Sequence, residues 1–146
     1  MESRLWQEWN EIWAIPVPNI LIGLRNNNIR TWVASITGPH DTPYYGGCFI
    51  MHIDFPENYP DSRPIFKMIT PIFHVNISSS GEVCLDILRA SYKPENKVGY
   101  MISCIIVLLT IPNPANAFNF TAKELYKKDK DAYENEARRL TMEHAM

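Results

Sequence analysis

The chain has 146 residues, of which 46% are hydrophobic and 12% aromatic, enough to build the core of one compact domain. Charged residues make up 21% of the chain and nearly balance at a formal net charge of −2, so it lacks the basic field of a protein that binds nucleic acid or an anionic membrane. These totals predict a single domain, residues 1–146, whose partners are proteins or small molecules.

Three features of the sequence indicate a reducing compartment of the cell. The first residues, MESRLWQEWNEIW, lack the basic start, apolar middle and small-residue cleavage site of a secretory signal. The longest apolar run, residues 100–109, is much shorter than the roughly 20 residues that cross a bilayer. The three cysteines are widely spaced, which fits neither a disulfide framework nor a zinc site. We therefore expect a cytoplasmic or nuclear protein.

Residues 2–14 are predicted to form an amphipathic helix, which Pro16 and Pro18 prevent from continuing. Its packing face consists of Leu5, Trp9, Ile12 and Trp13. Apolar segments typical of strands follow at residues 19–24, 31–37, 48–55 and 65–69. Because the turns between them are short, we expect these strands to form an antiparallel meander.

Three helices are predicted after the strands. Residues 98–110 are apolar almost all round, as expected of a central helix packed on a sheet, and the segment IPNPANAF ends that helix. Capping boxes that pair Thr121 with Glu124 and Asp131 with Glu134 predict two closing helices. One helix, a run of strands and then further helices is the order of an α+β fold.

The long irregular segment from Thr70 to Lys97 contains the best candidate for chemistry, because connections of this length are usually functional or disordered. Within it, Cys84 lies among small and polar residues, where exposure and nearby backbone donors would let a thiol act as a nucleophile. Cys48 falls in a strand and Cys104 in the central helix, and we assign both to packing. Cysteine environments alone would still favour a core role for Cys84.

A cysteine hydrolase needs a histidine base, and of the four histidines only His74 shares the segment of Cys84. A lone histidine in FHVN is more often a hydrogen-bonded support, so we interpret His74 as structural. Asn76 has an ordinary turn role and also the ability to donate to an oxyanion, and local sequence does not separate the two. Asp86 and Asn116, taken alone, are most simply solvated polar residues.

A set of motifs in order along the chain resembles the catalytic domain of the ubiquitin-conjugating enzymes, in their short form without extensions. The motifs are GPHDTPYYGGCF, IDFPENYPDSRP, FHVN, SSSGEVCLDIL, IPNPAN and YKKDKDAYENEARRLT. Each fragment alone is modest support, but the ordered set covers essentially the whole chain. The resemblance implies an α+β fold of four antiparallel strands with an N-terminal helix, a central helix and two C-terminal helices. It implies no metal and no organic cofactor.

The resemblance places the acceptor of ubiquitin's C-terminus, held as a thioester, at Cys84. The family's asparagine stands eight residues before the cysteine, and Asn76 keeps that offset. Asn76 would thus take an oxyanion or loop-ordering role, and His74 a structural one. Asp86 and Asn116 match positions near the acceptor lysine, where a polar group orients the amine while desolvation favours its neutral form. Because a thioester is already activated, no histidine base is required.

Three positions near the expected site depart from the family pattern. Val75 replaces the usual proline, which removes a fixed φ and restores a backbone N–H in the loop that holds Asn76. Asn116 stands where close relatives often have aspartate, so it would orient a lysine by accepting a hydrogen bond rather than by charge. Tyr92 replaces a tryptophan and keeps aromatic packing in support of the site.

The resemblance also implies contacts with an activating enzyme and a ubiquitin ligase, through the first helix and two loops. That helix is acidic, with a single basic residue against three carboxylates: Arg4 against Glu2, Glu8 and Glu11. Asp61, and Glu95 after Pro94, stand where the family commonly has apolar residues. Carboxylates are costly in an apolar contact unless the partner supplies cations, so we expect typical ligases to bind poorly.

The sequence therefore predicts an enzyme that takes ubiquitin from an activating enzyme onto Cys84 and passes it to a substrate lysine or a ligase cysteine, without nucleic acid or membrane as a partner. Another ubiquitin-like modifier is an alternative within the same chemistry. A weakly active or non-catalytic adaptor is a second alternative, favoured by Val75, Asp61 and Glu95 and disfavoured by Cys84 with Asn76. A cysteine hydrolase is a third, and would release modifier without ATP.

Overall fold

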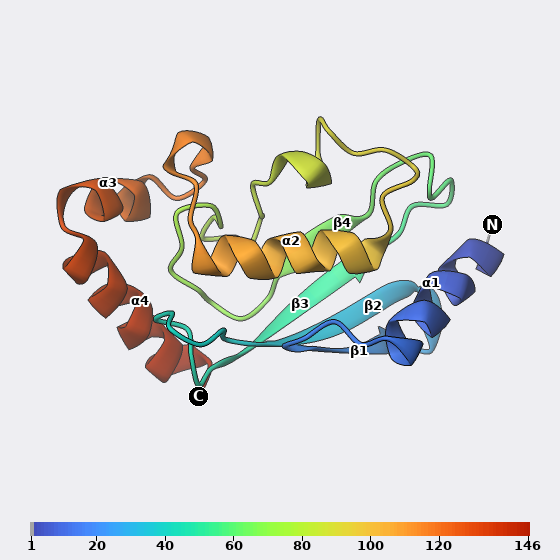
Figure 1. Ribbon diagram of the computed structural model, residues 1–146, viewed down its shortest axis with the longest axis horizontal. Helices are drawn as coiled ribbons and strands as arrows, with labels where there is room; N and C mark the ends of the chain where they lie inside the picture. Colours follow the sequence, from blue (N-terminus) through green and yellow to red (C-terminus); the bar gives the residue numbers. More distant parts are fainter. Residues whose placement is uncertain (1) are drawn as a thin grey trace.

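A four-stranded antiparallel sheet forms the centre of the computed structural model, which describes residues 2–146 (Figure 1). The strands lie side by side in chain order, β1, β2, β3 and β4. The elements are α1 (Glu2–Ala14), β1 (Ile20–Arg25), β2 (Asn28–Thr37), β3 (Cys48–Asp54), β4 (Ile65–Met68), α2 (Val98–Thr110), α3 (Phe120–Lys128) and α4 (Lys130–His144). Two short 3₁₀ turns, η1 (Asp86–Leu88) and η2 (Pro114–Asn116), flank α2 in sequence. The predicted α+β meander is confirmed.

The register of the sheet is set at the hairpin between β1 and β2. Asn26 and Asn27 both have a φ of 54°, a left-handed conformation that asparagine tolerates and that suits a tight hairpin. The alternation that follows brings one set of side chains to the core face, where Trp32 pairs with Ile53 across β2 and β3 and both are fully buried.

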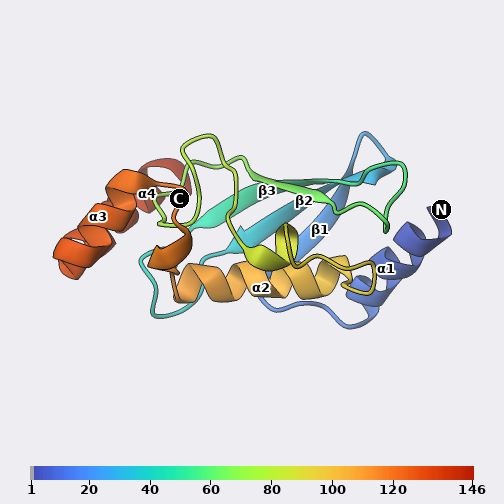
Figure 2. The same ribbon diagram turned by 90° about the horizontal axis from the view of Figure 1, so that it is seen from above.

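α2 lies along the core face of the sheet, with α1 near one end and α3 and α4 at the other (Figures 1 and 2). The buried side of α2 is formed by Val98, Met101, Ile102, Ile105, Leu108 and Leu109. Its opposite side is also apolar but exposed, as Tyr100 and Val107 show. The central helix therefore has more apolar surface than the sheet covers. None of the helices within residues 2–146 combines the length and the hydropathy needed to cross a membrane.

The predicted packing face of α1 is partly wrong. Leu5 and Ile12 are buried, but the Trp13 side chain is 51% exposed. Glu8 takes a place on the buried face instead, three residues after Leu5 and four before Ile12, and is only 1% exposed.

The predicted caps of the two closing helices are also wrong, although both helices exist. The Asn119 side chain accepts from the backbone N–H of Ala122 at 3.0 Å, so α3 begins at Phe120, before Thr121. The Asp129 carboxylate accepts from the N–H of Ala132 at 3.1 Å, so α4 begins before Asp131. Each true cap precedes the predicted one by two residues.

Candidate active site

In the irregular segment before α2, the stretch that contains Cys84 pairs with the stretch that contains Asn76. The Cys84 N–H donates to the Asn76 carbonyl at 2.8 Å, and Ile77 bridges Val83 in an antiparallel pair. Gly81 closes the turn between these stretches with a φ of 92°, and a side chain there would collide with the carbonyl of Met68. Cys84 is thereby fixed against Asn76 by main-chain bonds.

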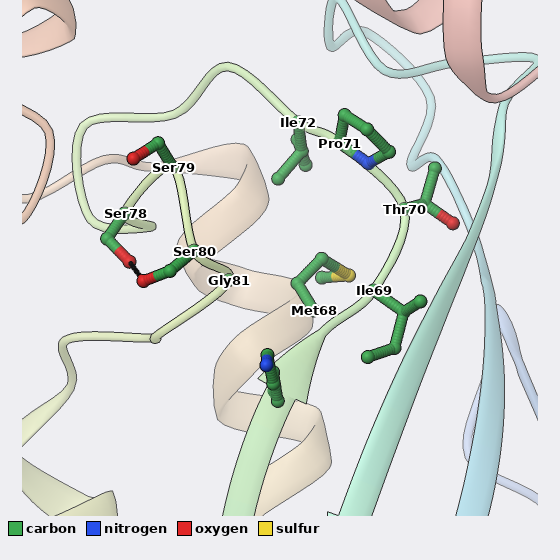
Figure 3. A pocket seen from close by; sticks show the side chains of 10 residues that line it. Met68, Ile69, Thr70, Pro71, Ile72, Ser78, Ser79, Ser80 and Gly81 are labelled. Atoms are coloured by element: carbon green, nitrogen blue, oxygen red, sulfur yellow. Dashed lines mark hydrogen bonds between the residues drawn. The ribbon is translucent and has the colours of Figure 1, made fainter.

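The turn between the two paired stretches, residues 78–81, faces the end of β4 across a hollow of about 240 Å³ (Figure 3). The hydroxyls of Ser78 and Ser80 lie 2.9 Å apart, and Ser78 Oγ also accepts from the N–H of Glu82 at 3.0 Å. Cys84 is not among the residues that line this hollow. The serines shape the turn that leads to the cysteine.

The Cys84 thiol is half-buried. Burial raises its pKa above the ordinary thiol value, the nearby Asp86 raises it further, and the Arg89 guanidinium acts in the opposite direction. The thiol is therefore mostly protonated at neutral pH. Cysteines that act as self-sufficient nucleophiles usually have a lowered pKa instead.

Asn76 is fully buried, and its side-chain amide is completely engaged. Its Nδ2 donates to the carbonyls of Asn113 and Asn116 at 2.7 and 2.8 Å, while its Oδ1 accepts from the N–H of Asn113 at 2.8 Å. Both amide hydrogens are used, so neither is directed at Cys84. The geometry supports the loop-ordering role of Asn76, because the residue ties the η2 segment to the stretch that pairs with Cys84.

His74 is fully buried between α2 and the Asn76 loop. Its Nδ1 accepts from the N–H of Asn76 at 2.9 Å, so the hydrogen is assigned to Nε2, which donates to the Leu108 carbonyl at 2.8 Å. Burial lowers the pKa of His74 to about 4, although the bond to Leu108 favours the charged form. The ring is a neutral support whose two nitrogens are both occupied.

The buried His74 predicts that stability falls in mild acid. In the unfolded protein His74 takes up a proton below about pH 6.5, whereas in the folded protein it does so only near pH 4. Between these values the unfolded state binds more protons, so the free energy of unfolding falls as the pH falls. The difference amounts to about 3 kcal/mol. Urea unfolding at several pH values should show that a His74→Gln variant depends less on pH in this window; parallel curves would contradict the prediction.

Asp86 and Asn116 lie on two segments that are linked to Cys84, η1 directly in the sequence and η2 through Asn76. Asp86 begins η1, and its exposed side chain lies two residues beyond the cysteine. Asn116 ends η2 with an exposed side chain, while its carbonyl is held by Asn76. The side chains of Asp86 and Asn116 are thus both exposed, one on the segment that follows the thiol and the other on the segment that Asn76 holds.

The remaining predicted site residues form a second group around α1 and the loop before α2. Arg4 donates to the Pro94 carbonyl at 2.5 Å and to the Glu8 carboxylate at 2.6 Å. Tyr92 donates to the Pro60 carbonyl at 2.7 Å, so it supports the loop of Asp61. The side chains of Asp61 and Glu95 are exposed. Arg4 is thus engaged within the molecule, and the carboxylates are accessible to a partner.

Burial raises the pKa of Tyr92 to about 12, with Arg4 acting in the opposite direction and Glu8, Asp61 and Glu95 adding to the rise. The two exposed carboxylates therefore act on the same hydroxyl. Sequence reasoning missed the centre of this group, Glu8, whose carboxylate also accepts from the Tyr59 hydroxyl and from the N–H of Val98, both at 2.7 Å.

An apolar groove of about 500 Å³ runs along the exposed side of α2 and reaches Leu85, the residue after Cys84. The sequence did not predict this groove. It is lined by Leu85, Tyr100, Ser103, Cys104, Val107, Leu108, Ile111 and Asn113. The signal for it was the excess of apolar residues in the central helix. Cys104 lines this groove and is only half-buried, while Cys48 is exposed, its sulfur 2.9 Å from Ser35 Oγ. The assignment of Cys48 to packing is therefore wrong, whereas Cys104 is partly packed and partly open to the groove.

Within the described residues, 2–146, no group of three or more histidine, cysteine, aspartate and glutamate side chains is placed to hold a metal ion. The other histidines lie elsewhere in the fold. His52 is in β3, His40 packs on Tyr45 with ring centroids 4.2 Å apart, and His144 ends α4.

Comparison with known proteins gives two findings. The family model described as "Ubiquitin-conjugating enzyme" matches residues 4–141. Among solved structures, the chain is similar to the E2 domain of a Toxoplasma gondii ubiquitin conjugating enzyme, with a TM-score of 0.92 and 29% sequence identity over 99% of this chain and 99% of that one.

Proposed function

The chain belongs to the ubiquitin-conjugating enzyme family, and on this premise we propose that it carries the C-terminus of ubiquitin as a thioester on Cys84 and transfers it to a substrate lysine or a ligase cysteine. The observation that carries the proposal is the setting of Cys84. Its half-buried thiol sits on a main-chain pair with Asn76, and Asn76 holds the η2 segment in turn. A deep pocket would exclude two large protein partners; this arrangement keeps the sulfur accessible.

The proposed reaction has two acyl transfers. In the first, the Cys84 thiol loses its proton to solvent and its sulfur attacks the thioester carbonyl of ubiquitin on the activating enzyme. The new C–S bond forms, the C–S bond to the activating enzyme's cysteine breaks, and that cysteine leaves as a thiolate that takes up a proton from solvent. In the second, a lysine nitrogen attacks the same carbonyl, a C–N bond forms, and the Cys84 thiolate leaves while the amine loses a proton to solvent. The activating enzyme consumes the ATP, so this chain holds no nucleotide.

The acceptor amine sets the remaining barrier. A lysine of pKa about 10.4 is neutral only about once in 2,500 molecules at pH 7. We assign Asp86 and Asn116 to orienting this amine as hydrogen-bond acceptors at the rim of the site. Their exposed positions on η1 and η2 support that assignment.

A hydrolase is disfavoured by the state of His74. A base must be able to accept a proton from the thiol, but both ring nitrogens of His74 are occupied inside the fold and its pKa is lowered to about 4 by burial. The adaptor alternative draws its support from Asp61 and Glu95, whose exposed carboxylates would suit a partner that supplies cations.

The test is to mix the protein with ubiquitin, its activating enzyme and ATP. We expect an adduct whose mass is that of the two chains less one water, and which a thiol reductant removes. Other pairs of ubiquitin-like modifier and activating enzyme should be run in parallel to identify the modifier. A folded protein that binds ubiquitin but is charged by none of the pairs is an adaptor, and release of modifier from a conjugate without ATP would identify a hydrolase.

A further inference from the structure

The backbone N–H of Val75 needs a partner inside the protein. Val75 is fully buried, and a buried N–H without a hydrogen bond is costly. A proline at this position, as the sequence resemblance implies for relatives, would have no N–H to satisfy. Here the hydroxyl oxygen of Tyr133, which comes from α4, accepts the Val75 N–H at 3.4 Å.

The Tyr133 hydroxyl belongs to a series of hydrogen bonds in which each group donates to the next. The Tyr44 hydroxyl lies 2.6 Å from the Phe73 carbonyl, which can only accept, so the single hydrogen of Tyr44 is used there. The contact of 3.2 Å between the two hydroxyls must then be donated by Tyr133. This leaves the Tyr133 oxygen to accept from Val75. The hydrogen-bond series therefore runs from the N–H of Val75 through the two hydroxyls to the carbonyl of Phe73. It links the backbone on the two sides of His74.

Packing holds both hydroxyls where the chain requires them. Tyr44 is 1% exposed and Tyr133 is 2% exposed. Their rings are fixed by other aromatic rings, Tyr44 edge-on to Phe49 at 5.9 Å and Tyr133 edge-on to Tyr126 at 5.0 Å. Burial raises the pKa of each tyrosine, so both hydroxyls keep the hydrogen that they donate.

We propose that Tyr133 and Tyr44 are positioning residues that fix the backbone of residues 73–75 by hydrogen bonds, in place of the φ that a proline at position 75 would fix. The stretch they hold leads directly to Asn76, which bonds Asn113 and Asn116 and accepts from the N–H of Cys84. The tyrosine clamp, meaning the bonds from Val75 through Tyr133 and Tyr44 to Phe73, thus acts on the cysteine through Asn76. Its effect on ubiquitin transfer rests on the proposed function, but the clamp itself does not.

A double-mutant cycle tests the clamp. Tyr133→Phe leaves the Val75 N–H without a partner, and should raise both the unfolding constant and the hydrogen exchange of the Cys84 amide roughly tenfold. In a Val75→Pro background the N–H is absent, and the same change should have less than about a twofold effect on either. Tyr126→Phe, which removes a hydroxyl from the neighbouring ring outside the clamp, is the matched control. Equal effects of Tyr133→Phe in both backgrounds would overturn the proposal.

A second cycle keeps the proposal testable if Val75→Pro does not fold. Tyr44→Phe and Tyr133→Phe remove links of one chain, so their combined effect on Cys84 amide exchange should be clearly smaller than the product of the single effects. Independent effects would reject the clamp. In charged protein, discharge of the thioester to free lysine should slow with Tyr133→Phe and recover in the proline background. Because the exchange experiment needs no ubiquitin, failure of charging would count against the proposed function only.

Discussion

Cys84→Ala is expected to abolish the reductant-sensitive adduct completely while leaving the protein folded. The thiol is half-buried, and removing one sulfur costs about 1 kcal/mol of stability or less. Gel mobility with and without reductant, together with a far-UV spectrum of each variant, checks both parts. Cys48→Ala and Cys104→Ala are matched controls, because they remove the other two thiols and should still be charged.

A Cys84→Ser variant tests whether the position alone, with a weaker nucleophile, still accepts the modifier. A Cys84→Ser hydroxyl that accepts ubiquitin gives an ester, which a thiol reductant does not cleave. We expect this variant to form a reductant-resistant adduct more slowly than the native chain forms its thioester, because a hydroxyl is the weaker nucleophile. An adduct of undiminished yield on Cys84→Ala would show that the nucleophile has been assigned to the wrong residue.

Glu8→Ala is expected to lower the free energy of unfolding by about 3–5 kcal/mol, because it leaves the buried Tyr59 hydroxyl and the Val98 N–H without their acceptor and Arg4 without its ion-pair partner. The carboxylate is 1% exposed and accepts from the Tyr59 hydroxyl, the Val98 N–H and the Arg4 guanidinium. The Val98 N–H opens α2, whose N-cap residue makes no side-chain cap bond, so Glu8 caps this helix from α1. Urea unfolding measures the loss.

Glu11→Ala is the matched control on the same helix. The Glu11 carboxylate is 45% exposed and pairs with Lys97 at 3.0 Å, and exposed pairs of this kind contribute less than about 1 kcal/mol. If the two alanine variants lose the same stability, the buried contacts of Glu8 do not anchor α1 to α2. A Glu8→Gln variant keeps one acceptor oxygen and should fall between the native chain and Glu8→Ala.

Elements with a regular pattern could be predicted from the sequence. The helix over residues 98–110 has the observed bounds, because a dense apolar run is closed by the prolines of IPNPAN. The four strands follow from their apolar alternation and from short turns such as the asparagine hairpin at Asn26 and Asn27. These signals are local, so neighbouring residues suffice to detect them.

The candidate site could be located but not built from the sequence. The position of Cys84 followed from its segment and from the resemblance, whereas the partners of Asn76 lie 37 and 40 residues away and only the fold brings them together. The buried contacts of Glu8 could not be predicted for the same reason, since Tyr59 and Val98 are 51 and 90 residues distant. The partner of the Val75 N–H, the Tyr133 hydroxyl, lies 58 residues further along the chain and is likewise brought there only by the fold.

The most direct test is to identify the atom that carries the modifier. The adduct formed with ATP and activating enzyme should be digested at acidic pH without reductant, and the joined peptides sequenced by mass spectrometry. We predict that the C-terminal residue of the modifier is joined to the peptide that contains Cys84, through its sulfur. Attachment to Cys48, to Cys104 or to a lysine of this chain, with Cys84 unmodified, would contradict the proposed function.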